Sequence, residues 1–328
     1  MTTRLFLTFC ILASSLFALD TIQVAGNRFV TSDGETIIFR GLNTSDPDKL
    51  EKEGMWSDAY FAEMAAWGAN VVRFPVHPAA WRERTAEKYL EMLDAGVELA
   101  KKHNLYVIID WHSIGNLWQQ LYQHPSYETT IDETYEFWRT IARRYADEPA
   151  VAFYEIYNEP TISGQRFGTM SWEQWKQLQE NIIRVIRAWD KKTIVLCAGF
   201  DWAYDLTPVR EEPIDAENIA YVSHPYPQKR EQPWEEKWEQ DWGFVADTHP
   251  VFLTEIGFCL ADERGAHMPV ISTVDYGEAI TAYAEKKGIS WVAWVFDTSW
   301  APMLVWDWQF TPTTQGAFFK RYLQEKMR

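Results

Sequence analysis

The sequence of 328 residues is poor in cysteine and in basic residues. It holds three cysteines, and two of them, Cys197 and Cys259, lie in apolar, strand-like segments that indicate neither a metal site nor a disulfide framework. The 31 lysine and arginine residues are outnumbered by 47 aspartate and glutamate residues, which gives a formal net charge of −16. Because nucleic-acid binding depends on basic residues that neutralise phosphates, this balance argues against a nucleic-acid partner and favours a neutral one.

Two kinds of sequence pattern are also absent. No G-x-G-x-x-G or P-loop pattern follows an early apolar run, which argues against a doubly wound sheet that binds phosphate groups. No linker rich in proline or serine, no repeat and no low-complexity tract divides the chain after residue 18. We therefore expect a single catalytic domain over residues 19–328, long enough to bury a sizeable core.

The first 18 residues are typical of a secretory signal peptide. Arg4 precedes an apolar stretch over residues 5–12, and small residues up to Ala18 precede a plausible cleavage site. The apolar stretch is short for a spanning helix, and Asp20 follows closely. We expect a signal peptide over residues 1–18 and a soluble, secreted or periplasmic protein without stable membrane insertion. A retained membrane anchor is the alternative.

Eight short apolar runs recur along the chain. Several are rich in Val, Ile, Phe and Tyr without polar alternation, which is typical of parallel strands covered on both faces. Amphipathic stretches separate the runs, and those that begin at Thr130 and Ser171 fit the capping-box pattern of a helix start. The runs span residues 37–42, 70–76, 105–110, 152–158, 193–198, 219–223, 251–255 and 291–296, and the predicted helices span residues 57–67, 86–103, 130–145, 171–189, 234–247, 273–287 and 315–326.

The alternation of strand and helix predicts an α/β fold. About eight repeats over roughly 300 residues favour a (β/α)8 TIM barrel, whose active site forms at the carboxyl ends of the strands. Residues 208–218, between the fifth and sixth runs, read mostly as loop. A doubly wound sheet is the competing architecture.

Polar residues gather near the ends of these runs, and two of them are glutamates. Asn158 and Glu159 are placed at the end of the fourth run, and Glu255 ends the seventh. Glycoside hydrolysis needs such a pair, one carboxyl to protonate the leaving oxygen and one carboxylate to attack the sugar or activate water. A single buried His or Tyr is more often a core residue, but barrel closure would bring all these positions to one rim. The candidates are Arg73, His112, Asn158, Glu159, His224, Tyr226, Glu255 and Trp294.

The segments around these residues resemble glycoside hydrolase family 5, the cellulase family of clan A, across nearly the whole chain after residue 18. The resemblance implies a TIM-barrel glycosidase that acts on a β-linked polysaccharide or oligosaccharide. Since the two carboxyls supply the acid and the nucleophile, no metal or other cofactor is implied. The matching segments are VVRFP over residues 71–75, DWH over 110–112, YNEP over 157–160, HPY over 224–226 and TEIG over 254–257, together with Trp294.

The resemblance also implies a role for each candidate. Glu159 would be the acid/base, Glu255 the nucleophile, Asn158 the ligand of the sugar 2-hydroxyl, and Trp294 the floor of the subsite that holds the cleaved sugar. Arg73, His112, His224 and Tyr226 would surround the reacting centre. We expect Arg73 and the Tyr226 hydroxyl to favour the carboxylate form of Glu255, while a neighbouring charge and partial desolvation keep Glu159 protonated.

These assignments predict a monomeric, retaining endo-β-1,4-glucanase that works through a glycosyl-enzyme intermediate. Tryptophans in the loops after the strands are candidate stacking platforms for sugar rings, although about half would instead anchor loops. A β-mannanase or another β-glucanase of the same family is the alternative substrate class, and a noncatalytic glycan-binding barrel is the alternative function. The candidate platforms are Trp56, Trp118, Trp202, Trp300 and Trp306.

Overall fold

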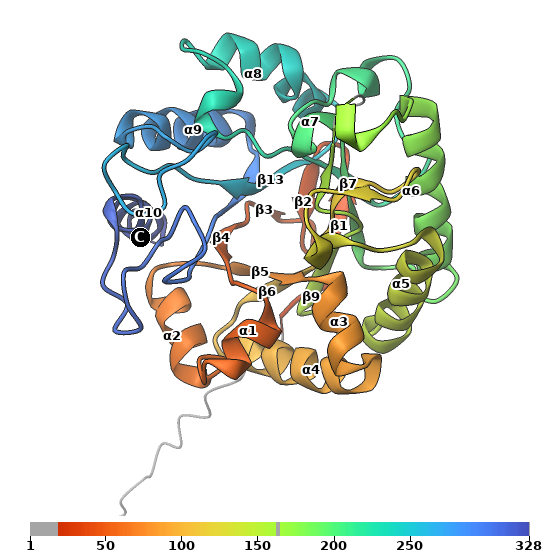
Figure 1. Ribbon diagram of the computed structural model, residues 1–328, viewed down its shortest axis with the longest axis horizontal. Helices are drawn as coiled ribbons and strands as arrows, with labels where there is room; N and C mark the ends of the chain where they lie inside the picture. The colour runs from red at the N-terminus through yellow and green to blue at the C-terminus, as the bar shows by residue number, and fades with distance from the viewer. Residues whose placement is uncertain (1–18, 162–164, 328) are drawn as a thin grey trace, which may run out of the picture.

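A computed structural model describes residues 19–161 and 165–327, so the signal peptide expected over residues 1–18 lies outside the described residues. Eight parallel strands close into a barrel in the order β11-β12-β13-β14-β4-β5-β6-β9, which confirms the predicted fold class (Figure 1). Each barrel strand overlaps one of the eight predicted runs. They are β4 (Arg40–Asn43), β5 (Val71–Val76), β6 (Tyr106–Trp111), β9 (Val151–Glu155), β11 (Ile194–Ala198), β12 (Ile219–Val222), β13 (Val251–Ile256) and β14 (Ser290–Ala293).

Helices surround the barrel and cover the outer face of its strands (Figure 1). The Ser171 capping box forms in full, with both reciprocal hydrogen bonds present, whereas Thr130 caps its helix through its own side chain. The helices are α1 (Pro47–Lys52), α2 (Asp58–Ala66), α3 (Pro78–Arg84), α4 (Ala86–Lys102), α5 (Ile131–Tyr145), α6 (Trp172–Arg187), α7 (Phe200–Ala203), α8 (Glu235–Asp241), α9 (Val274–Lys287) and α10 (Thr314–Lys326). No helix of the described residues is long and apolar enough to cross a membrane.

Two predicted elements are divided in the structure. The helix expected over residues 234–247 ends as α8 at Asp241 and continues as a 3-10 helix over Gly243–Asp247. A Cβ on Gly243 would lie only 1.9 Å from the hydroxyl of Tyr283 in α9, so glycine is required at this close approach. The first apolar run is divided between β3 (Thr36–Ile37) and β4.

Two small sheets extend the barrel. At one end, β3 pairs with a hairpin of β1 (Gln23–Ala25) and β2 (Arg28–Val30). Elsewhere β10 (Glu159–Pro160) pairs in parallel with β7 (Ile114–Asn116), which pairs with β8 (Leu121–Tyr122). The second sheet matters for the site because β10 begins with Glu159.

The inside of the barrel changes character along its axis. Toward the amino ends of the strands, Phe29, Phe39 and Phe153 pack edge to face, with ring centroids 5.2 Å apart for Phe29 and Phe153 and 4.9 Å apart for Phe39 and Phe153. Side chains of a strand alternate between its two faces, so the next inward residue lies two positions further on. In β5 and β9 those next residues are Arg73 and Glu155, both fully buried. A charged layer therefore lies directly on an apolar one.

Candidate active site

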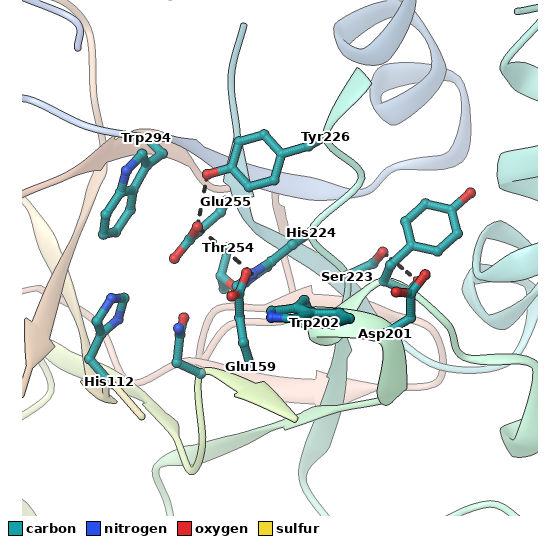
Figure 2. Close-up of polar contacts among 12 residues, drawn as sticks. His112, Glu159, Asp201, Trp202, Ser223, His224, Tyr226, Thr254, Glu255 and Trp294 are labelled. Atoms are coloured by element: carbon teal, nitrogen blue, oxygen red, sulfur yellow. Dashed lines mark hydrogen bonds and ion pairs between the residues drawn. The ribbon is translucent and has the colours of Figure 1, made fainter. Parts of the chain in front are cut away.

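The carboxyl ends of the strands bring the predicted site residues together around a cleft of about 400 Å³ (Figure 2). Arg73 and His224 lie beneath the cleft and are fully buried. The other predicted residues line it directly, in company with residues from several loops. They are His112, Asn158, Glu159, Tyr226, Glu255 and Trp294.

The two predicted catalytic carboxyls lie close together and share one neighbour. Nδ1 of His224 is 2.9 Å from Oε1 of Glu159 and 3.8 Å from Oε2 of Glu255. One oxygen of each glutamate and one nitrogen of His224 all lie within 4.8 Å of one another. The arrangement brings two carboxyl groups and an imidazole together at a single point of the cleft.

The structure corrects the expected position of two site residues. Glu159 does not end the fourth barrel strand: β9 ends at Glu155, and Glu159 begins β10, where it pairs with Ile114. Trp294 was expected inside the eighth strand, but β14 ends one residue earlier at Ala293. Leaving the strand allows the Trp294 ring to lie parallel to the ring of His112, with centroids 5.4 Å apart.

Arg73 connects the buried charges beneath the cleft. Its Nε and Nη2 donate to Oε2 and Oε1 of Glu155 at 2.6 and 3.0 Å, and its Nη1 donates to Oε1 of Glu255 at 3.1 Å. Burial lowers the pKa of Arg73, but the charges of Asp110, Glu155 and Glu255 outweigh burial, and the pKa lies above its ordinary value. Arg73 therefore remains a cation that neutralises part of the negative charge under the site.

Arg73 also orients Asn158. Its Nη2 donates to Oδ1 of Asn158 at 2.6 Å, which fixes the amide with its oxygen directed at the guanidinium. The amide nitrogen of Asn158 then has no hydrogen-bond partner among the described residues, although it is buried. Asn158 lines the cleft, so this NH2 group is a buried donor available to a bound molecule.

The ionisation of Glu255 differs from the expectation. Tyr226 donates to Oε2 of Glu255 at 2.8 Å, and Arg73 contacts its other oxygen, as the sequence predicted. Burial nevertheless has the largest influence and raises the pKa of Glu255, while His224 and Arg73 lower it and the charge of Glu159 raises it further. The outcome is a pKa above the ordinary value, and a carboxylate of raised pKa is a more basic nucleophile.

His112 is the neutral imidazole of the site. Its Nδ1 lies 2.6 Å from Oδ2 of Asp110. Burial, followed by the positive charges of His77, Arg73 and His224, holds the pKa of His112 well below its ordinary value. Asp110 and Glu155 thus support the His112 ring and the Arg73 guanidinium group, and neither is among the residues that line the cleft.

Trp202 is the predicted stacking platform that lines the cleft. It lies in a turn where Asp201, Trp202 and Ala203 all have left-handed backbone angles, with φ of 56°, 55° and 56°. Its indole nitrogen donates to Oε1 of Gln123 at 2.8 Å, and Nζ of Lys229 lies 5.0 Å from the ring centroid. These contacts hold the ring beside Glu159 (Figure 2).

The other candidate platforms divide between the site and the scaffold. The Trp300 ring stacks beside that of Trp294, with centroids 6.1 Å apart at an interplanar angle of 17°, although Trp300 is not among the residues that line the cleft. Trp56 instead packs against Phe61 and Phe74 in the core and is an anchor. Trp118 and Trp306 are not among the residues that line the cleft.

Sequence reasoning missed several residues of the site. Asn43 accepts from Nη1 of Arg73 at 2.9 Å, and its position at the end of β4 was a usable signal. Thr254 forms hydrogen bonds with His224 and Glu155. In the sequence it is marked only as part of the TEIG segment. The cleft residues from loops carry no comparable signal because no strand end marks them. They include Gln123, Tyr127, Lys229, His267 and Met268.

Glu159, His224 and Glu255 form the one group of potential metal ligands found in the part of the chain that the structure describes. The atoms of this group already hydrogen-bond within the protein, to each other in the case of Glu159 and His224 and to Tyr226 in the case of Glu255. These contacts account for the group as an acid–base cluster. We therefore do not assign a metal centre to it.

A family profile described as "Cellulase (glycosyl hydrolase family 5)" matches residues 30–299. The chain belongs to glycosyl hydrolase family 5. This membership agrees with the paired carboxyls and with the barrel. The family resemblance inferred from the segments around Arg73, Glu159 and Glu255 is thereby confirmed.

Named relatives within family 5 are cellulases and endoglucanases. Endoglucanase A of Butyrivibrio fibrisolvens is 28% identical over 254 residues, which cover 74% of this chain and 53% of that protein. Cellulase CelDZ1 of a Thermoanaerobacterium species is 26% identical over 84% of this chain and 70% of that protein. The chain thus spans about half the length of the first relative.

Solved structures of family 5 enzymes superpose on the chain. The β-glucanase SdGluc5_26A of Saccharophagus degradans is 46% identical with a TM-score of 0.93, and 95% of each chain is covered. The same enzyme has been solved in complex with cellotetraose, at 45% identity and the same TM-score of 0.93. The endoglucanase Cel5A of Thermobifida fusca, at 21% identity and a TM-score of 0.74 over 93% of this chain and 98% of the other, shares the fold.

Proposed function

We propose that this protein is a retaining, endo-acting glycoside hydrolase that cleaves β-1,4-linked glucan. The observation that carries the proposal is the closeness of the two carboxyls, whose oxygens lie with His224 Nδ1 inside 4.8 Å. Retaining glycosidases place their carboxyls roughly 5 to 5.5 Å apart, whereas inverting ones leave roughly 6.5 to 9.5 Å for a water molecule. The short spacing supports direct attack on the sugar.

In the first step, a carboxylate oxygen of Glu255 attacks the anomeric carbon and forms an ester bond. The bond from that carbon to the leaving oxygen breaks, and the oxygen takes the proton of Glu159. Arg73 and Tyr226, which contact the two oxygens of Glu255, hold this carboxylate in place while its charge is lost.

In the second step, Glu159 acts as a base. Neutralisation of Glu255 in the ester removes a nearby negative charge, which makes Glu159 easier to keep ionised. Glu159 takes a proton from water, the oxygen of that water bonds to the anomeric carbon, and Glu255 leaves as a carboxylate. Two inversions at one carbon give net retention.

The remaining cleft residues fit the binding of the reacting sugar. The free NH2 of Asn158 is placed to donate to the 2-hydroxyl. The Trp294 indole offers a flat apolar surface for one face of the sugar ring, and His112 lies parallel to it. The name of the similar β-glucanase, and its complex with cellotetraose, support a β-glucan as the substrate of this chain.

Initial rates on three polymers test the substrate class. We expect hydrolysis of carboxymethylcellulose and barley β-glucan to exceed that of glucomannan. Rapid hydrolysis of glucomannan with negligible rates on both glucans would instead establish the β-mannanase alternative. Binding of all three without cleavage would establish a noncatalytic barrel.

The stereochemistry of the product tests the mechanism. Time-resolved NMR of a cello-oligosaccharide digest should show the β-anomer first, because two inversions preserve the configuration. An α-anomer that appears first would contradict the assignment of Glu255 as nucleophile. The test does not depend on which glucan is preferred.

We further propose that the chain is exported and works as a monomer without a metal. The sequence of residues 1–18 supports export, and the two carboxyls supply the chemistry. The mature protein should begin near residue 19 in N-terminal sequencing, elute as a monomer in size-exclusion chromatography, and keep its rate when a chelator is added.

A further inference from the structure

A chain of hydrogen bonds runs from the buried charge layer to the proposed acid/base. The hydroxyl of Thr254 lies 2.8 Å from Oε1 of Glu155 and 2.9 Å from Nε2 of His224. The other ring nitrogen, Nδ1, lies 2.9 Å from Oε1 of Glu159. Thr254, His224 and Glu159 are drawn together in Figure 2. All the linking atoms belong to buried residues from β9, β10, β13 and the segment after β12.

The direction of each bond follows from what each group can donate. Both oxygens of Glu155 accept from Arg73. Burial raises the pKa of Glu155, but Arg73 and His224 outweigh burial and hold that pKa below its ordinary value, so Glu155 is a carboxylate. A carboxylate only accepts, so the Thr254 hydroxyl must donate its single proton to Glu155. The Thr254 oxygen then accepts, and Nε2 of His224 must carry a proton.

We propose that Thr254 is a positioning residue that keeps His224 protonated at Nε2, so that Nδ1 is the only ring nitrogen that exchanges a proton and Glu159 is its partner. This inference rests on the proposed function, because it assigns a task to a group behind the proposed acid. It concerns a threonine that does not line the cleft and acts only through the imidazole.

The protonation of Nδ1 decides which oxygen of Glu159 carries the acidic proton. When the ring is a cation, Nδ1–H donates to Oε1, so the proton of Glu159 must sit on Oε2. When the ring is neutral, Nδ1 accepts, and the proton of Glu159 is drawn to Oε1 and held in a bond to the ring. Only the cationic ring leaves the proton of Glu159 free for transfer to the leaving oxygen.

Charged and titratable groups from several elements face His224. Burial lowers its pKa, and Glu255, Glu155 and Glu159 raise it, with a net rise to about 9. Arg73, Asp110 and His112 lie behind these groups, and the charge of His224 influences the pKa of Asp110 and of His112. The cationic ring therefore prevails at neutral pH beside an ionised Glu159, and the carboxylates of Glu155 and Glu255 still favour the cation when Glu159 takes up a proton. Loss of the His224 proton is expected to form the alkaline limb of the rate profile.

Replacing Thr254 tests the assignment. In Thr254→Val the Nε2–H of His224 loses its acceptor, and the nearest remaining one, Oε1 of Glu155, is 3.7 Å away. With cellotetraose as substrate, kcat at pH 7 should fall about tenfold with KM changed less than about twofold, and the alkaline limb of kcat/KM should move down by roughly 1 pH unit. Thr254→Ser keeps the hydroxyl and should restore both values.

Thr281 provides a matched control. It is also a buried threonine, but its hydroxyl donates to the backbone oxygen of Gly277 within α9, at 2.8 Å. Thr281→Val should leave the pH profile unchanged even if it lowers stability. A profile of Thr254→Val that matches wild type, or one that Thr254→Ser fails to restore, would overturn the proposal.

Nitrogen NMR of the wild-type protein tests the proposal without any Thr254 variant. With 15N-labelled histidine, and with the His224 signals identified by their loss in His224→Asn, Nε2 should stay protonated from pH 6 to pH 10 while Nδ1 titrates. A neutral ring that carries its proton on Nδ1 would contradict the proposal. This readout remains valid if no β-glucan is hydrolysed, so failure of the proposed function is separable from failure of the inference.

Discussion

The two ends of the barrel interior are built from the same strands but by opposite means. Near the amino ends, Phe39, Phe153 and neighbouring rings fill the space between the strands without any charge. Two residues further along β9, Glu155 lies in the same column and pairs with Arg73. Burial of apolar surface in the lower layer stabilises the barrel. The upper layer contains buried ionised groups, whose desolvation opposes folding and is offset by their ion pairs.

This contrast separates the source of stability from the source of reactivity. The lower layer consists of apolar side chains that take no part in the proposed reaction. The upper layer concentrates carboxyls around Arg73 and His224, and burial raises the pKa of Glu255 at some cost in folding free energy. Substitutions in the two layers should therefore have opposite signatures, and each prediction below compares activity with unfolding.

The largest effect on activity is expected from Glu255→Gln. Loss of the proposed nucleophile should reduce kcat on barley β-glucan at least about 1000-fold. Because the folded pKa of Glu255 is raised, its ionisation at neutral pH opposes folding, and the amide should leave the unfolding midpoint equal or higher. Rate assays and thermal unfolding at pH 7 measure both. Residual hydrolysis near the wild-type rate would remove Glu255 from its role.

Arg73→Met should damage both properties, because it leaves Glu155 and Glu255 buried without their cation. Breaking one partner of a buried ion pair costs about 3 to 5 kcal/mol of unfolding free energy, and kcat should fall about 100-fold as Asn158 and Glu255 lose their contacts. The unpaired carboxyls should acquire raised pKa values, so the variant should gain stability as pH falls from 7 to 5. Urea unfolding at both pH values checks this. A variant that is equally stable at both would contradict the account.

Phe153→Ala should have the opposite signature. Removal of a buried ring costs about 3 to 5 kcal/mol of unfolding free energy, while kcat of the folded enzyme at 25 °C should stay within about threefold of wild type. The Phe153 ring packs against Phe29, Phe39 and Phe252 and is not among the residues that line the cleft. Trp189, a ring that is 49% exposed, serves as the comparison, and Trp189→Ala should cost less than about 1 kcal/mol. A large loss of kcat in folded Phe153→Ala would show that the layers are not separate.

The smallest effect is a pH dependence of stability. The folded pKa of His224 is raised to about 9 from 6.5, so the cation's contribution is fully present below about pH 6.5 and is lost as pH rises through about 9. Wild type should lose a few degrees more of its unfolding midpoint between pH 6.5 and 9.5 than His224→Asn does. Equal slopes for the two proteins, measured by thermal unfolding, would show that His224 does not gain its proton on folding.

Much of this organisation could be predicted from the sequence, for a physical reason. Parallel strands covered on both faces are continuous apolar runs, and eight of them alternating with helices leave few architectures. Polar residues near the ends of such runs, such as His112 and Glu255, must then meet at one rim. The contacts of Arg73 with Glu255 and of Tyr226 with Glu255 follow from that meeting.

What the sequence could not predict depends on register and on loops. The contacts of Thr254 with Glu155 and His224 depend on how β13 is positioned relative to β9 and to the segment after β12. No local sequence pattern predicts these relative positions. The left-handed turn at Trp202 contains no glycine to mark it. The sequence predicts that Arg73 and Tyr226 lower the pKa of Glu255. It does not show how deeply Glu255 is buried, and burial raises this pKa more than these neighbours lower it.

The phenylalanine layer has one further consequence for the working enzyme. Apolar rings pack on one side of Arg73 and Glu155, and the cleft lies on the other side. A glucan strand that enters the cleft displaces water and alters the medium around every ionisable group at once. The proton affinities of the empty and the occupied enzyme should then differ, and the acid and alkaline limits of kcat need not coincide with those of kcat/KM.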